Sequence, residues 1–142
     1  MDSNPKQIKI LKQLYDIYDT IPAINCKHCH SCDGPIIWFK PEEINIKEYL
    51  KQHHQQPISW TNEEFQKHHM RCPYLRNNRC FIYPVRPLVC RLQGTISELP
   101  CHQGVLPVLS ENQLLEIKNK FNQLLKKSNG FTMFFSTRRY LP

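Results

Sequence analysis

Cysteines carry most of the chemistry that this sequence could do, and the chain has seven of them. Cys26, Cys29 and Cys32 follow one another at C-x2-C spacing, in a stretch that closes with a Gly-Pro turn. This spacing lets one tight loop direct several sulfur atoms at a single centre, as zinc and iron–sulfur proteins do. It therefore predicts a metal site, in which His28 and His30 are companions of the loop and not expected ligands.

A second group of cysteines lies in the segment Arg71–Arg91, which holds five of the seven arginines and no acidic residue. Its members are Cys72, Cys80 and Cys90. Thiolates that converge on one metal concentrate negative charge, and guanidinium groups offset it by charge and by hydrogen bonds to sulfur. The segment is therefore predicted to supply further ligands. The alternative is a solvated, arginine-rich hairpin whose cysteines are ordinary buried residues.

The sulfur atoms fit two kinds of metal site. The first group, together with a Cys72 that precedes a proline, has the three-plus-one ligand arrangement of a [4Fe–4S] cluster, which the sequence favours. Cys80, Cys90 and Cys101, with Asp33 or a histidine, would then remain for a second site, for which zinc is the candidate. Two tetrahedral zinc sites would use the same residues. The sequence does not assign individual sulfur atoms to either metal.

Length and composition limit the class of protein. The 142 residues suffice for one domain with a modest core. The odd number of cysteines excludes complete disulfide pairing, and the first residues lack the apolar run of a secretory signal, so we expect a reducing, cytoplasmic location. No window approaches the roughly 18 apolar residues of a membrane span. An enzyme finds little support, because there is no glycine-rich phosphate loop and no Cys/His pair apart from the metal-like spacing.

The formal net charge of +7 raises the question of nucleic-acid binding. The excess is concentrated around the cysteines and in the stretch Glu116–Pro142, which has six basic residues and one acidic residue. Much of it can balance metal-bound thiolates. A nucleic-acid partner is therefore less favoured than a protein partner.

Short elements must position the cysteines. Five helices are predicted, at 4–20, from 40 to about 54, from 62, at 88–92, and from 110 to a stop at Asn129-Gly130. Asn4 is the cap of the first helix. Glu42 and Glu43 are ordinary acids of the first turn of the second helix. Trp60 and Phe65 should anchor the short helix that starts at 62.

The remaining elements are less regular. Residues 36–39 form a short apolar run. Asn77-Asn78 suits a tight hairpin turn that brings Cys72 and Cys80 toward one end. Residues 131–135 are either a last strand or a docking tail. The expected fold is a small, single α+β domain over residues 1–142, with helices packed around a loop-rich, hairpin-containing metal-binding centre.

These motifs also carry a family resemblance. The stretches CKHCHSC, FKPEEI, CPYL, CFIYPVRPLVCR and CHQGVLPVL, within residues 26–109, together resemble the YkgJ-type cysteine-cluster family. The most specific stretch runs from Cys80 to Arg91. The resemblance implies a zinc- or iron-chelating domain followed by a basic C-terminal helix and tail at 110–142. It also implies seven thiolate ligands, namely Cys26, Cys29, Cys32, Cys72, Cys80, Cys90 and Cys101.

The chain departs from that family at one position. The first group of the family generally ends in two adjacent cysteines, whereas this chain has Asp33. Asp33 is therefore either an oxygen ligand or the mark of an altered site. Arg86 and Arg91 flank Cys90 and are expected to act beside the ligands, with Arg86 pairing with Asp33 or donating to sulfur or to a neighbouring carbonyl.

The resemblance implies metal binding more than a reaction. A related motif in flagellin lysine methylases suggests an accessory, electron-transfer or metal-handling protein with a protein partner, such as an enzyme or a methylase-type system. The alternative function is a zinc-stabilised binding module whose basic C-terminal helix contacts nucleic acid or an acidic protein.

Overall fold

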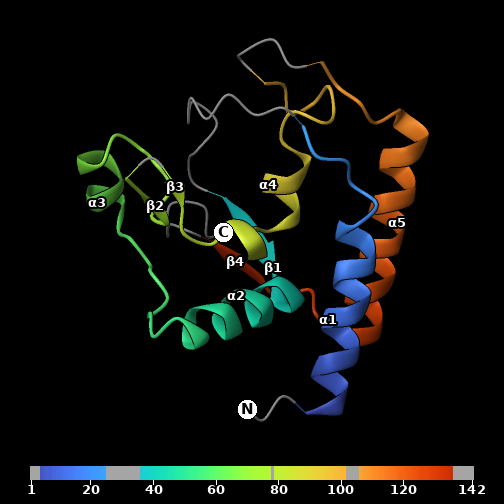
Figure 1. Cartoon of the computed structure of the whole chain (residues 1–142), viewed down its shortest axis with the longest axis horizontal. Coiled ribbons are helices and arrows are strands. Elements are labelled where there is room, and N and C mark those ends of the chain that lie inside the picture. The colour runs from blue at the N-terminus through green and yellow to red at the C-terminus, as the bar shows by residue number, and fades with distance from the viewer. Residues whose placement is uncertain (1–3, 25–35, 78, 102–105, 136–142) are drawn as a thin grey trace.

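The fold is a small, mostly helical α+β domain, as predicted (Figure 1). The structure is a computed structural model that describes residues 4–24, 36–77, 79–101 and 106–135. Its elements in chain order are α1 Pro5–Tyr18, β1 Ile37–Phe39, α2 Lys40–Gln52, α3 Asn62–Lys67, β2 Leu75–Arg76, β3 Arg79–Cys80, the 3-10 turn η1 Tyr83–Val85, α4 Leu88–Leu92, α5 Glu111–Ser128 and β4 Met133–Phe135.

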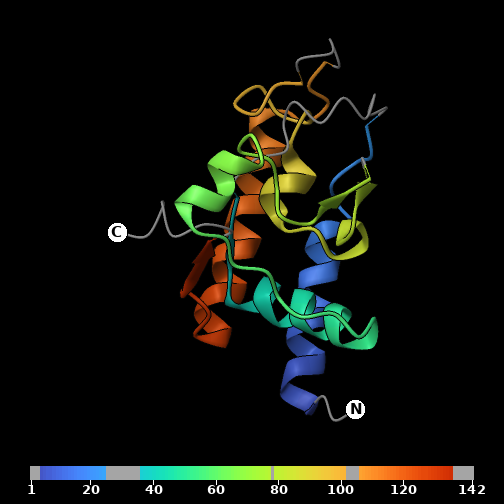
Figure 2. The same cartoon turned by 90° about the vertical axis from the view of Figure 1, so that its left-hand side faces the viewer.

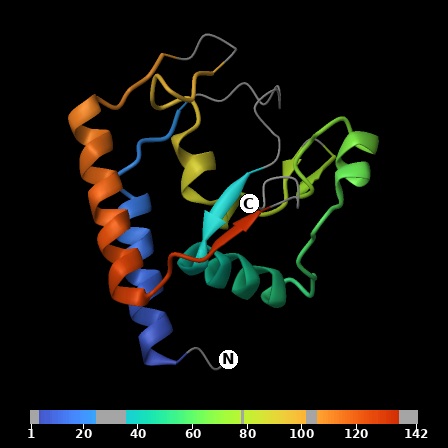
Figure 3. The same ribbon diagram turned by 180° about the vertical axis from the view of Figure 1, so that it is seen from behind.

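The two long helices, α1 and α5, lie side by side along one flank of the molecule (Figures 1 and 3). Each presents an apolar stripe at helical spacing, and the stripes meet in the first core cluster. Its buried members are Leu14, Ile17, Tyr18, Ile117, Phe121, Leu124 and Leu125. This pair is the largest packed unit of the described chain.

Local capping signals explain where these helices begin and end. The Asn4 side chain accepts a hydrogen bond from the Gln7 backbone N–H at 2.8 Å, and Ser110 and Gln113 form a reciprocal capping box. Asn129 ends α5 in the left-handed conformation with φ 53°. The predicted caps and stop are therefore confirmed.

The second core cluster lies between α2, β1 and the hairpin. It buries Trp38, Ile46, Leu50, Tyr74, Ile82 and Val85. Strands β2 and β3 pair antiparallel with Leu75 opposite Cys80, and Asn77 takes a positive φ of 49° in the turn, as predicted. Figure 2 looks onto this flank, with α3 and the hairpin both in view.

The C-terminal segment 131–135 contributes a strand and not a loose tail. β4 pairs antiparallel with β1, with Trp38 opposite Phe134. Because β1 begins at Ile37, shortly after the first cysteine group, the far end of the chain fixes the exit from that group.

A buried carboxylate joins three helices, which the sequence did not indicate. Glu42 is 1% exposed, and it accepts hydrogen bonds from the Tyr18 hydroxyl at 2.6 Å, from the Phe39 backbone N–H at 3.2 Å and from the backbone N–H of Leu88. The guanidinium of Arg91 lies 3.8 Å from the centre of the Tyr18 ring. The expected role of Glu42 as an ordinary first-turn acid was incomplete, since its carboxylate ties α2 to α1 and α4.

Burial determines how these groups titrate. Loss of hydration raises the pKa of Glu42 above its usual value, although its hydrogen bonds and Arg91 oppose that shift. Burial and the neighbouring Glu42 raise the pKa of Tyr18 well above its usual value. Glu43, also buried, accepts a hydrogen bond from the Trp38 indole at 3.1 Å. The first turn of α2 is thus part of the core.

Candidate metal centre

Four of the seven predicted cysteine ligands lie in the described part of the chain, and each is partly buried. They are Cys72, Cys80, Cys90 and Cys101. The other predicted ligands, Cys26, Cys29, Cys32 and Asp33, lie outside the described residues, as do His28 and His30.

Cys72 and Cys80 belong to the hairpin side of the core. Both pack against the second core cluster, Cys80 from β3 and Cys72 from the turn that precedes β2. The Leu75 backbone N–H donates to the Cys72 carbonyl at 3.1 Å, which closes that turn. The hairpin therefore holds both cysteines against one face of the core.

Cys90 lies in the short helix α4, which runs between the α1–α5 pair and the hairpin (Figures 1 and 3). Pro87 caps this helix, and the Cys90 backbone N–H donates to the Pro87 carbonyl at 3.0 Å. Leu88, at the first position of α4, is bound to Glu42 through its backbone N–H. The buried carboxylate therefore positions the helix that carries Cys90.

Cys101 is held by a loop that folds back on itself. The Gly94 N–H donates to the Leu99 carbonyl at 2.7 Å, and the Gln93 side-chain amide donates to the Pro100 carbonyl at 2.9 Å. Gly94 has φ +84°, and a Cβ placed on it would lie 3.5 Å from the Cys101 Cβ and 2.5 Å from the Ile24 Cδ1. Cys101 and Ile24 therefore meet over the same glycine.

The contacts of Ile24 and Ile36 matter because these residues border the segment 25–35, which contains the first cysteine group. Ile24, on the entry side, lies over Gly94 beside Cys101. Ile36, on the exit side, packs against the same core cluster as Cys72 and Cys80. The fold thus places Ile24 against the same glycine as Cys101, and Ile36 on the same core cluster as Cys72 and Cys80.

The described residues do not by themselves form a complete zinc or iron site. Within the described ranges, no three His, Cys, Asp or Glu side chains gather closely enough to hold a metal ion. A structural zinc site takes four ligands, and a cubane cluster takes four thiolates. A complete site built on Cys72, Cys80, Cys90 or Cys101 would therefore need ligands from outside the described residues, where Cys26, Cys29 and Cys32 lie.

Arg86 and Arg91 bind backbone carbonyls around the turn that leads into α4. Arg86 donates to the Tyr83 carbonyl at 2.9 Å and stacks 3.9 Å from the centre of the Tyr83 ring. Arg91 donates to the Arg86 carbonyl at 2.8 Å and to the Pro84 carbonyl at 3.0 Å. A neighbouring carbonyl is one of the partners expected for Arg86, and its pairing with Asp33 stays a prediction.

Replacing Gly94 by alanine should loosen the loop that holds Cys101. The positive φ disfavours any residue with a Cβ, and the new methyl group would meet Ile24, so we expect a loss of about 1 to 2 kcal/mol in the free energy of unfolding. Chemical denaturation measures the loss. Thr132→Ala, at an exposed residue before β4, is the control and should change stability by less than about 0.5 kcal/mol. Equal stability of both variants would show that the close approach at Gly94 is unimportant.

A comparison with known families identifies the motif as a whole. A family model described as "CxxCxxCC: Putative zinc- or iron-chelating domain" matches residues 25–123. The match begins just before Cys26, and it covers all seven cysteines and most of α5. No curated protein and no solved structure gives a significant match.

Proposed function

The chain belongs to the CxxCxxCC family of zinc- or iron-chelating cysteine-cluster domains, and we propose that it binds an iron–sulfur cluster, with [4Fe–4S] favoured over zinc. In this proposal the ligands come from Cys26, Cys29, Cys32, Cys72, Cys80, Cys90 and Cys101, with Asp33 as an oxygen ligand or a near neighbour. The protein serves a partner enzyme, such as a methylase-type system, by handling metal or passing electrons.

One observation carries this proposal. The residues on either side of the segment 25–35 share neighbours with later cysteines, since Ile24 and Cys101 both lie against Gly94, and Ile36, Cys72 and Cys80 all pack against the second core cluster. Metal sites built from remote sequence segments need this kind of convergence, because ligands must come within bonding distance of one centre.

The residues around the cysteines have definite tasks in this proposal. A bound cluster would supply one-electron chemistry, whereas zinc would cross-link the loops. The second core cluster limits the access of water to Cys72 and Cys80, and Arg86 and Arg91 fix the turn before Cys90. We place the protein in a reducing cytoplasm, because thiolate ligands must stay reduced. None of the described helices has the length and apolar character of a membrane span.

Cysteine variants test the proposal. Cys72→Ser, Cys80→Ser and Cys90→Ser should each remove half or more of the bound metal, because a serine hydroxyl replaces thiolate poorly as a ligand for zinc or iron. Elemental analysis and visible absorbance of anaerobically purified protein give the readout. A brown protein indicates an iron–sulfur cluster, and a colourless protein that contains zinc indicates a zinc site. His53→Gln is the control, since His53 bonds to the Tyr49 carbonyl at 2.9 Å. Full metal content in all three serine variants would contradict the ligand assignment.

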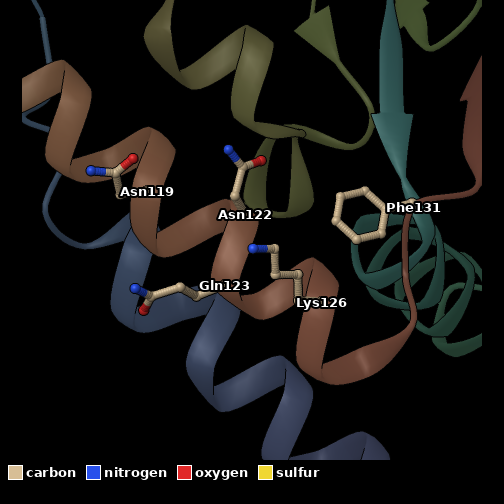
Figure 4. Close-up of a pocket in the computed structure, with 5 residues that line it drawn as sticks. All are labelled: Asn119, Asn122, Gln123, Lys126 and Phe131. Atoms are coloured by element: carbon tan, nitrogen blue, oxygen red, sulfur yellow. The ribbon is translucent and has the colours of Figure 1, made fainter.

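A groove on α5 favours a second candidate, a zinc-stabilised module that contacts nucleic acid or an acidic protein. The groove has a volume of about 430 Å³ and opens on the outer face of α5, with an exposed phenylalanine at its rim (Figure 4). Its lining residues are Asn119, Asn122, Gln123, Lys126 and Phe131. Amides, a cation and an aromatic ring can bind polar, anionic partners. Salt-sensitive binding of a labelled single-stranded RNA, lost on Lys126→Glu, would favour this candidate.

A further inference from the structure

A second cleft lies between α3 and the hairpin, next to a predicted metal ligand. Its volume is about 440 Å³. Its lining residues are Trp60, Lys67, His68, His69, Arg71, Cys72, Leu75 and Asn77. This lining contains two permanent cations, two imidazoles and the Cys72 thiol, and it contains no carboxylate.

A sharp reversal of the chain builds this cleft. After α3 ends at Lys67, His69 and Met70 take positive φ angles of 58° and 61°, which non-glycine residues seldom adopt. The Met70 backbone N–H donates to the Phe65 carbonyl at 2.7 Å and holds the reversal in place. Arg71 and Cys72 are thereby brought back alongside Trp60.

Aromatic contacts fix the wall of the cleft. Phe65 is 1% exposed, and its ring lies 5.1 Å from that of Trp60. The His68 ring stacks on Trp60 at 4.5 Å with an interplanar angle of 17°. The indole is therefore held in a fixed position at the cleft, where it can report on a bound molecule.

Lys67 and Arg71 give the cleft its positive charge. Neither Lys67 nor Arg71 forms an ion pair with any carboxylate in the described part of the chain. Glu64, an acid of α3, is engaged in capping, because it accepts hydrogen bonds from the Thr61 N–H at 3.2 Å and hydroxyl at 3.1 Å. The carbonyls of Glu64, Phe65 and Gln66, near the end of α3, accept from the backbone N–H groups of residues 68–70.

We propose that this cleft binds a small oxyanion, held by Lys67 and Arg71 beside Cys72. A guanidinium fork and an ammonium group both suit carboxylate or phosphate oxygens, and the imidazole N–H groups can donate in either protonation state. The inference extends the proposed function, and its link to metal rests on Cys72 being a ligand. A metal ion that arrives as an anionic chelate would then lie next to the Cys72 thiolate. Zinc and iron bind thiolate more tightly than they bind carboxylate.

Tryptophan fluorescence tests the proposal directly. The chain has two tryptophans, and Trp38 is buried in the second core cluster, so a change caused by a small anion should come from Trp60. The purified protein is titrated with citrate in one arm and inorganic phosphate in the other, at constant ionic strength with potassium chloride. A saturable change in fluorescence is expected in at least one arm. If the Trp60→Phe variant shows no such change, the fluorescence change comes from Trp60. The arm with the lower Kd identifies carboxylate or phosphate as the preferred chemistry.

Charge variants separate a built site from general attraction. The double variant Lys67→Gln/Arg71→Gln should weaken binding about tenfold or more, Arg71→Lys should keep part of it, and Lys47→Gln, on the exposed face of α2, should change it less than about twofold. Equal affinity in the double variant, or no saturable response to either anion, would overturn the proposal. Metal content measured on the same samples keeps the two ideas apart: protein that binds the anion but contains no zinc or iron after anaerobic purification would support this cleft and contradict the proposed function.

Discussion

Glu42→Ala is expected to lower the free energy of unfolding by about 3 to 5 kcal/mol, the largest effect of any single substitution considered for this protein. The carboxylate is 1% exposed and accepts from the Tyr18 hydroxyl and from the backbone N–H groups of Phe39 and Leu88. Alanine would leave one buried and two partly buried donors without their acceptor, and a cavity at the junction of α1, α2 and α4. Denaturant unfolding at neutral pH gives the value.

Glu42→Gln is the matched variant, because glutamine keeps the volume and one acceptor oxygen. It should lose about 1 to 2 kcal/mol at neutral pH, since its NH2 group cannot accept a hydrogen bond. Glu48→Ala, on the same helix and only partly buried, is the control, with an expected change below about 0.5 kcal/mol. If Glu42→Ala unfolded no more easily than Glu48→Ala, the buried carboxylate would not be the junction described here.

The difference in stability between the natural protein and Glu42→Gln should depend on pH, with a definite sign. The folded pKa of Glu42 is raised from its usual value of 4.5, mainly by burial, so the folded state holds the proton more tightly than the unfolded state. This contribution to stability is fully present below about pH 4.5 and is lost as the pH rises through the raised pKa. Glutamine resembles the neutral carboxyl, so the stability of the natural protein relative to Glu42→Gln should fall over that interval. A rise would contradict the assignment.

Removing the metal should have the second large effect. Outside the α1–α5 pair, the described core consists of two smaller clusters, and the described cysteines lie on short elements: a two-residue strand, a five-residue helix, a turn and a loop. The part of the chain that carries the cysteines should gain much of its order from metal ligation, because the free energy of metal binding adds to the free energy of folding. We expect the melting temperature to fall by more than about 10 °C on chelation.

Hydrogen exchange would show where the order is lost. Amides of β2, β3 and α4 should exchange faster in the metal-free protein, while those of α1 and α5 keep their protection, because the first core cluster contains no cysteine. Cys80→Ser provides a second route to the same state without a chelator. Identical melting and exchange in loaded and metal-free protein would mean that the cysteines do not support the fold.

Local signals account for what the sequence predicted correctly. A proline after Asn4, the Ser110 and Gln113 pair and the Asn129-Gly130 stop act within one helical turn, so they mark the ends of α1 and α5. Cysteine spacing is likewise local, and it identified the ligand candidates. Whether these cysteines converge on one metal depends on tertiary contacts, and the structure describes only the residues that flank the first group.

The features that the sequence did not predict depend on contacts between distant residues. Glu42 lies 24 residues from Tyr18 and 46 from Leu88, so its position in the first turn of a helix gave no sign of burial. The cleft beside Cys72 depends on left-handed backbone at His69 and Met70, residue types that rarely signal such a turn. The sequence left open whether residues 131–135 form a strand or a tail. The structure shows a strand, because β4 pairs with β1, and that pairing joins residues far apart in the chain.

X-ray absorption at the edge of the bound metal tests the central claim most directly, because it reports the atoms that surround the metal. Anaerobically purified protein should give a first shell dominated by sulfur at about 2.3 Å, with an additional iron–iron distance if a cluster is present. The sulfur contribution should decrease in Cys80→Ser and Cys90→Ser and stay unchanged in His53→Gln. A first shell made only of nitrogen and oxygen, in a protein with all seven cysteines reduced, would contradict the account.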